Sequence, residues 1–257
     1  MDLNLKGKRV LVTGGSKGIG KASAQVLAAE GCVAMIASRD AKALQAAAGE
    51  IKSATGAEVK WKAIDLSQRG AAEALAAWAG DLDILVNNAG AIPGGDLLTV
   101  DEDTWRRAWD LKVFGYINLS RVVYRAMKAK QRGVIVNVLG NAGERLNAGY
   151  IAGSTGNAGL MAFTRALGSV SHKDGIRVVG VNPGPVATER LVSLYKQQAA
   201  SKLGDEKRYE ELYAGMAFKR PATPEEIAWT VAFTASERSS YTTGVYFTID
   251  GGLGASH

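Results

Sequence analysis

Short runs of β-branched and other apolar residues recur along the chain, separated by longer segments rich in Ala and Leu. The short runs predict strands at 9–13, 33–37, 59–64, 84–87, 134–139, 176–181 and 245–249. The longer segments carry apolar residues at helical spacing and predict helices at 18–29, 41–55, 67–79, 104–130, 154–172 and 224–235. Strand and helix alternate almost throughout, and several strands are near-continuous apolar runs. This pattern is typical of parallel strands whose two faces are both covered by helices.

No Pro/Gly/Ser-rich linker, internal repeat or low-complexity segment divides the sequence. We therefore expect a single α/β domain over residues 1–257, with a doubly wound parallel sheet of seven strands and helices on both faces. The polar and charged segment 189–218 departs from the alternation. It follows a strand, where a doubly wound sheet places loops over a ligand. Two interpretations of this segment stay open, a mobile substrate lid and an exposed helical hairpin.

Composition and charge narrow the function classes. Lys and Arg total 31 against 25 Asp and Glu, but the resulting charge of +6 is spread along the chain, so a small anionic molecule is favoured over nucleic acid. One cysteine, Cys32, and two separated histidines, His172 and His257, argue against a transition-metal site. No apolar run is long enough to span a membrane, and the N-terminus lacks the layout of a secretion signal. We expect a cytoplasmic protein with no membrane or nucleic-acid partner.

The first predicted strand leads directly into a glycine-rich turn, residues 13–20, with the sequence TGGSKGIG. Gly14, Gly18 and Gly20 allow a sharp turn, a close approach to a pyrophosphate and tight packing of the following helix. The start of that helix adds free N–H groups and the positive end of its dipole. Because a strand precedes the turn and a helix follows it, the motif predicts a dinucleotide-binding loop.

Further motifs appear in order after this loop: Asp65-Leu66, the sequence NNAG at 87–90, Pro183-Gly184 followed by Thr188, and a closing DGG at 250–252. With these motifs the whole chain resembles the short-chain dehydrogenase/reductase family. The resemblance implies a Rossmann fold, an oxidoreductase and a homotetramer. It also implies that Asp65 contacts the adenine, that 87–90 line the cofactor cleft and that Thr188 holds the nicotinamide carboxamide. The expected cofactor-binding residues are Thr13, Gly14, Ser16, Lys17, Gly18, Ile19, Gly20, Ser38, Arg39, Asp65, Leu66, Asn87, Ala89, Gly90, Pro183, Gly184 and Thr188.

The end of the second predicted strand indicates which dinucleotide binds. Members of the family that select NAD usually carry an acidic residue there, which accepts hydrogen bonds from the ribose diol. This chain has Ser38 and then Arg39, and the glycine-rich turn adds Lys17. Guanidinium and ammonium groups form strong charge-assisted bonds to phosphate, so the pattern favours NADP(H). The alternative is NAD(H), with Asp40 accepting the ribose bonds.

The residues that carry out the family's usual chemistry are absent. Members commonly reduce a carbonyl with an Asn, a Ser, and a Tyr and Lys spaced Tyr-x-x-x-Lys. In a gap-free register those positions hold Lys112, Gly140, Gly153 and Asn157. A glycine has no side chain to donate or accept a proton, so the usual mechanism does not operate from these positions.

Two of the four changes are reciprocal, since Lys112 replaces an Asn and Asn157 replaces a Lys. We hypothesise that Lys112 restores the missing cation beside the nicotinamide ribose; the alternative is a Lys112 that extends to solvent. Tyr150, one helical turn before Gly153, is the candidate proton donor, and Ser154 is a further polar candidate. The alternative is that Tyr150 only packs against its neighbours at the start of a helix. Its spacing to Asn157 matches the Tyr-x6-Lys spacing of enoyl reductases in the family.

These observations predict an NADP(H)-dependent oxidoreductase with a nonstandard active site, acting on a carbonyl/alcohol pair of a small molecule. The candidate catalytic residues are Lys112, Tyr150, Asn157 and Ser154. Two alternatives stay open. One is an enoyl-type reductase of C=C bonds, and the other is a catalytically silent protein that binds or senses NADP(H).

Overall fold

Seven parallel strands form the centre of the molecule, which a computed structural model describes for residues 1–255; His257 lies outside them. Their order across the sheet is β3-β2-β1-β4-β5-β6-β7. The direction in which strands are added reverses between β1 and β4, so this is the switch point at which a doubly wound sheet opens a crevice. The strands are β1 (Arg9–Thr13), β2 (Val33–Ser38), β3 (Lys60–Ala63), β4 (Ile84–Asn87), β5 (Gly133–Val138), β6 (Ile176–Pro183) and β7 (Tyr246–Ile249).

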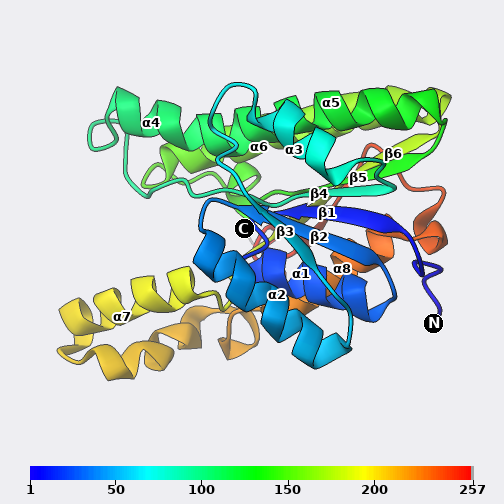
Figure 1. Cartoon of the computed structure of the whole chain (residues 1–257). Helices are drawn as coiled ribbons and strands as arrows, with labels where there is room; N and C mark the ends of the chain where they lie inside the picture. The colour runs from blue at the N-terminus through cyan, green and yellow to red at the C-terminus, as the bar shows by residue number, and fades with distance from the viewer. Residues whose placement is uncertain (256–257) are drawn as a thin grey trace.

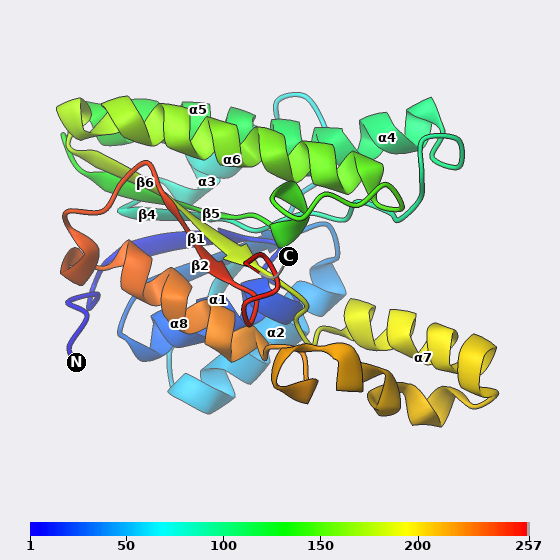
Figure 2. The same cartoon turned by 180° about the vertical axis from the view of Figure 1, so that it is seen from behind.

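Helices cover both faces of the sheet (Figures 1 and 2). One face carries α1 (Gly18–Ala29), α2 (Ala41–Thr55) and α8 (Pro224–Ala235), and the other carries α3 (Ala71–Ala79), α5 (Gly115–Ala129) and α6 (Ile151–Ser171). Successive strand residues point to opposite faces, so Val10 and Val12 of β1 belong to one buried cluster and Leu11 to the other. The predicted fold class is confirmed.

The predicted helix 104–130 is interrupted in the structure. It consists of α4 (Glu102–Trp109), a π-helical segment η1 (Asp110–Phe114) and then α5. Single-turn π segments are rare within α-helices and are frequent at functional sites. This one contains Lys112.

The other predicted helices begin close to the expected residues, with two differences. Helix α3 begins at Ala71 rather than at 67, because Asp65 folds the preceding residues into a turn by accepting the backbone N–H of Ser67 at 3.0 Å. Helix α6 begins at Ile151 rather than at 154, directly after Tyr150. Among residues 1–255 no helix combines the length and the apolar character needed to cross a membrane.

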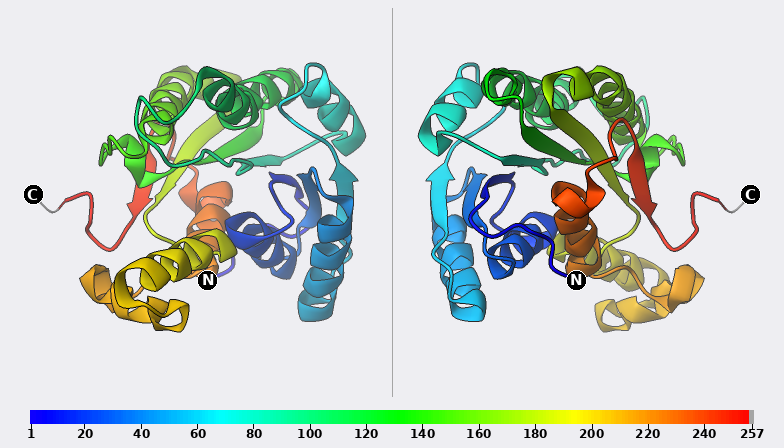
Figure 3. Two further views of the ribbon diagram at one scale, coloured as in Figure 1. Left: turned by 90° about the vertical axis from the view of Figure 1, so that its left-hand side faces the viewer. Right: turned by 90° about the vertical axis from the view of Figure 1, so that its right-hand side faces the viewer.

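The segment 189–218 forms a helical hairpin that projects from the body of the molecule (Figures 1 and 3). Helix α7 (Glu189–Leu203) ends at Gly204, whose φ of +75° favours glycine, and the 3₁₀ helix η4 (Glu206–Gly215) returns along it. The Tyr195 and Tyr213 rings, with centroids 5.1 Å apart, join the two arms. Movement of this hairpin as a lid stays a prediction.

Candidate active site

A cleft of about 700 Å³ opens at the carboxyl ends of the strands, at the switch point between β1 and β4. Its walls come from the glycine-rich turn, the end of β2, the residues after β4 and β5, the η1 segment and the first turn of α7. The predicted cofactor-binding residues that line it are Gly14, Ser16, Lys17, Gly18, Ile19, Ser38, Arg39, Leu66, Ala89, Gly90 and Thr188.

Thr13 and Gly20 lie behind the cleft wall and hold it in place. The Thr13 hydroxyl accepts the backbone N–H groups of Asn88 at 2.9 Å and Ala89 at 3.1 Å, which ties the ends of β1 and β4 together. At Gly20 a Cβ would lie 2.3 Å from the carbonyl oxygen of Gly14, so only glycine lets α1 pack this closely. These contacts fix the shape of the turn.

The remaining predicted residues do not line the cleft. Asn87 is buried, and its side-chain N–H group donates to two side-chain oxygens at 2.9 Å each, one on α5 and one on β5. Asp65 accepts the Ser67 hydroxyl at 2.8 Å. Pro183 is buried at the end of β6, and a Cβ on the next residue, Gly184, would lie 2.7 Å from the Asp250 Cβ.

The glycine-rich turn fits a bound diphosphate. Gly14 and Gly18 have φ values of +65° and +55°, and a Cβ on Gly14 would lie 2.9 Å from the Ala89 Cα. Lys17 is the N-cap residue of α1, and within the described chain no side chain caps that helix and its first turn holds no acid. The free N–H groups and the positive end of the helix dipole therefore face the cleft, where they favour an anion.

The end of β2 fits the phosphorylated ribose of NADP(H). The Ser38 hydroxyl is buried, and no residue of 1–255 gives it a hydrogen-bond partner. Six buried side-chain oxygens of residues 1–255 lack a partner, and Ser38 is the one among the residues that line the cleft, where a ligand can supply the bond. Arg39, beside it, lines the cleft, whereas the Asp40 carboxylate caps α2 by accepting the backbone N–H of Ala43 at 3.0 Å. Asp40 is thus already engaged by the backbone of α2.

Lys112 enters the cleft from the π-helical segment η1 rather than extending to solvent. Its stem crosses Gly90, where a Cβ would lie 2.6 Å from the Lys112 Cδ, and its ammonium group donates to the Leu139 carbonyl oxygen at 3.3 Å. Burial, together with the positive charge of Arg190, lowers the pKa of Lys112 from 10.5 to about 8. The ammonium group is therefore present at neutral pH and titrates close to it.

The Tyr150 ring occupies the space above Gly153. A Cβ at Gly153 would lie 2.0 Å from the Tyr150 Cζ, so the phenol and a side chain at 153 exclude each other. Burial raises the pKa of Tyr150, and the facing Arg190 guanidinium, as a charge and a hydrogen-bond donor, opposes that rise. Tyr150 does not itself line the cleft, but it adjoins Arg190, which does.

Asn157 and Ser154 lie deeper in α6. The Asn157 side chain donates to the Gly153 carbonyl oxygen at 2.8 Å, and its own carbonyl oxygen is buried without a hydrogen-bond partner in the described chain. A Cβ on Gly140 would lie 3.2 Å from that side chain, so Asn157 reaches the residue next to the one that Lys112 binds. Ser154 accepts the backbone N–H of Asn147 at 3.1 Å and faces that loop.

Arg190 is the residue of this site that the sequence did not indicate. It is the second residue of α7, and its guanidinium donates to the Ile92 carbonyl oxygen in the segment after β4. It therefore bridges the helical hairpin and the body of the molecule across the cleft. The available signal was weak: a basic residue two positions after the Thr188 motif.

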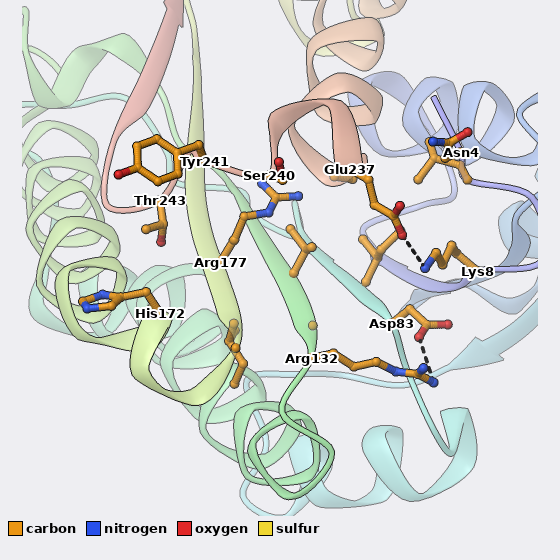
Figure 4. A pocket seen from close by; sticks show the side chains of 17 residues that line it. Asn4, Lys8, Asp83, Arg132, His172, Arg177, Glu237, Ser240, Tyr241 and Thr243 are labelled. Carbon is orange, nitrogen blue, oxygen red and sulfur yellow. Dashed lines mark hydrogen bonds and ion pairs between the residues drawn. The ribbon is translucent and has the colours of Figure 1, made fainter. Parts of the chain in front are cut away.

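A second cavity, of about 610 Å³, lies at the opposite, amino ends of the strands (Figure 4). Its charged side chains are paired with one another: Lys8 lies 3.0 Å from Glu237, and Arg132 lies 3.7 Å from Asp83. Arg177 donates to three backbone carbonyl oxygens. Because these polar groups already have partners, this cavity is a weaker candidate site than the cleft.

Comparison with known proteins adds three findings. A family model described as short chain dehydrogenase matches residues 8–199. A 3-oxoacyl-[acyl-carrier-protein] reductase of Chlamydia muridarum is 32% identical over 257 residues, which cover 98% of this chain and 100% of that protein. The solved structure of L-sorbose reductase from Gluconobacter frateurii, complexed with NADPH and L-sorbose, is 30% identical, superposes with a TM-score of 0.92 and covers 100% of both chains.

Proposed function

The chain belongs to the short-chain dehydrogenase family, and on that premise we propose that it is an NADP(H)-dependent oxidoreductase acting on a carbonyl/alcohol pair through a nonstandard set of side chains. The observation that carries the proposal is the exchange at Gly153: the phenol of Tyr150 fills the space that a side chain at 153 would take. A phenol is thus retained next to the cleft although the usual tyrosine position is a glycine. The homotetramer and the cytoplasmic location expected from the sequence stay predictions.

The cofactor would be held by the residues that fit it. The start of α1 suits the diphosphate, and the buried Ser38 hydroxyl with Arg39 suits the 2′-phosphate. The L-sorbose reductase, whose structure is a complex with NADPH, supports the same choice for this chain. When bound, NADPH supplies a hydride to the carbonyl carbon, and NADP⁺ accepts one in the reverse direction.

The chain's own residues then have three tasks. Tyr150 holds the proton that a carbonyl oxygen takes up on reduction. Lys112 places a positive charge in the cleft, where negative charge develops during that reduction. Asn157 positions the first turn of α6 by its bond to the Gly153 carbonyl oxygen, and so keeps the backbone under the Tyr150 ring in place.

Binding and turnover test the proposal separately. NADPH should bind at least about tenfold more tightly than NADH, and Arg39→Gln should remove most of this preference because one charge-assisted contact to the 2′-phosphate is lost. Arg69→Gln, at an exposed arginine of the turn before α3, is the matched control and should keep the preference. Equal affinity of the wild-type protein for NADPH and NADH would contradict the cofactor assignment.

Turnover is followed as oxidation of NADPH with a pooled panel of ketones, aldehydes and quinones. We expect consumption that depends on the panel and that disappears in Lys112→Ala. A protein that binds NADPH tightly but consumes none of it with any panel member would favour the silent binding protein instead.

A further inference from the structure

Two cationic side chains, Lys112 and Arg190, line the same cleft from different elements. Each donates only to neutral groups: Lys112 to the Leu139 carbonyl oxygen at 3.3 Å, and Arg190 to the Ile92 carbonyl oxygen and toward the Tyr150 phenol. In the part of the chain that the structure describes, no Asp or Glu forms an ion pair with either.

The surroundings of the pair offer no compensating charge. Glu189 lines the same cleft, but its carboxylate lies 3.6 Å from Lys17. Arg190 is close enough to Lys112 to disfavour the ammonium form, which means that the two charges repel each other in the free protein. Lys112 is half-buried and Arg190 is exposed, so an anion bound between them relieves the repulsion at the ammonium group.

The phosphates of the cofactor are an unsuitable anion for this pair. Their proposed places are the start of α1 and the end of β2, whereas Lys112 binds the end of β5. At about 4.8 Å per strand, the end of β2 lies roughly 14 Å from the end of β5, and the end of β1, before α1, lies roughly 10 Å from it. Glu189, next to Arg190, reaches Lys17 at the diphosphate place, but the Arg190 guanidinium itself bonds to Ile92 after β4 and faces Tyr150. Both cations therefore point to the substrate end.

We propose that the substrate is an oxo acid or hydroxy acid whose carboxylate is bound by the Arg190 guanidinium and stabilised by Lys112. The planar guanidinium matches the two oxygens of a carboxylate, and it keeps free N–H groups after bonding to Ile92. The carboxylate would lie beside Tyr150, so the reacting carbonyl is only a few bonds away from it. The position of that carbonyl rests on the proposed function, whereas the binding of the carboxylate does not.

The test measures binding without turnover. The protein saturated with NADP⁺ is titrated calorimetrically with acetoacetate and with methyl acetoacetate, neither of which oxidised cofactor can reduce. Wild-type protein should bind the acid at least about tenfold more tightly than the ester, the value of one charge-assisted contact. Arg190→Gln keeps an N–H donor for Ile92 and should bring the two affinities within about twofold. Lys202→Gln removes an exposed charge from the last turn of the same helix and should leave the difference intact.

Three results would overturn the carboxylate site. The first is that the wild type binds acid and ester equally or binds neither. The second is that Arg190→Gln weakens the binding of acid and ester by the same factor. The third is that Arg190→Gln weakens the binding of NADP⁺ and leaves the binding of the acid unchanged. A protein that binds the acid in this way but transfers no hydride from NADPH to acetoacetate, to other oxo acids or to any panel member keeps the carboxylate site and loses the proposed function. The two failures are thereby distinguishable.

Discussion

Both ends of the sheet carry cationic side chains, but the partners of these side chains differ between the two ends. At the amino ends, Lys8 pairs with Glu237, Arg132 lies 3.7 Å from Asp83, and Arg177 donates to three carbonyl oxygens. These groups satisfy one another, and the cavity between them needs no ligand to be stable.

The carboxyl ends lack such partners. Within residues 1–255 the Ser38 hydroxyl and the Asn157 carbonyl oxygen are buried without hydrogen bonds, and Lys112 and Arg190 have no acidic partner. Buried oxygens without a partner also occur at Ser23 of α1 and at Ser239 near the amino ends, so the two ends differ mainly in their charged side chains. The ion pairs at the amino ends favour the carboxyl ends as the functional end, which the similar volumes of the two cavities do not decide.

The largest effect is expected from Lys112→Ala. Removal of the cation should lower kcat/KM by about 100-fold or more and weaken NADPH binding, because the charge that opposes developing negative charge is lost. Stopped-flow kinetics measure kcat/KM, and fluorescence titration measures the affinity for NADPH. Unchanged turnover together with unchanged NADPH affinity would exclude Lys112 from the site.

Loss of Arg177 should lower the stability of the protein and leave NADPH binding and turnover nearly unchanged. Arg177→Met leaves the carbonyl oxygens of Thr234, Ser236 and Thr242 without this donor, and we expect about 3 kcal/mol less stability in denaturant unfolding. NADPH affinity and turnover should stay within about twofold of the wild type at a temperature where the variant is folded. A large change in NADPH affinity would mean that the two ends of the sheet are coupled.

The contact between Tyr150 and Gly153 predicts a smaller, position-specific effect. Gly153→Ala places a Cβ 2.0 Å from the Tyr150 ring, which must move, at a cost of about 1–3 kcal/mol in unfolding free energy and with a loss of activity. Gly159→Ala is the control in the same helix, because a Cβ there meets nothing within 4 Å; it should stabilise the protein by about 0.5–1 kcal/mol. Equal effects of the two substitutions would contradict the packing of Tyr150.

The smallest predicted effect is a pH dependence. The folded-state pKa of Lys112 is lowered to about 8, so the ammonium group is present below that pH and is lost as pH rises through it. Turnover that needs this charge should fall about tenfold per pH unit above 8. Lys112→Arg should retain its charge, and whatever activity it has should not fall in this range. An identical decline in both proteins would assign the titration to another group.

The architecture was predictable because it depends on local patterns. The period of apolar residues indicated the seven strands, and the glycine-rich turn with its flanking strand and helix indicated the position of the cleft. The register of the family motifs also brought Lys112, Tyr150 and Asn157 forward as candidates, and the structure places all three at the carboxyl end of the sheet.

The rest of the site depends on tertiary packing. No local sequence pattern indicates the π-helical turn that directs Lys112 inward, and the sequence predicts one continuous helix over residues 104–130. Arg190 was missed because its partner, Ile92, is 98 residues away in the sequence. The spacing of Tyr150 and Gly153 was visible, but the position of the ring above the glycine requires coordinates.

The most direct test of the central claim follows deuterium from nicotinamide-labelled NADPH into a pool of ketones, aldehydes, quinones, oxo acids and enoyl thioesters by mass spectrometry. The proposal predicts label on a former carbonyl carbon with the wild-type protein, and about 100-fold slower labelling with Tyr150→Phe, which lacks the proton donor. Label on an alkene β-carbon would instead identify an enoyl-type reductase. Absence of label in every product, with NADPH binding confirmed in the same samples, would contradict the claim that these altered residues form a hydride-transfer site.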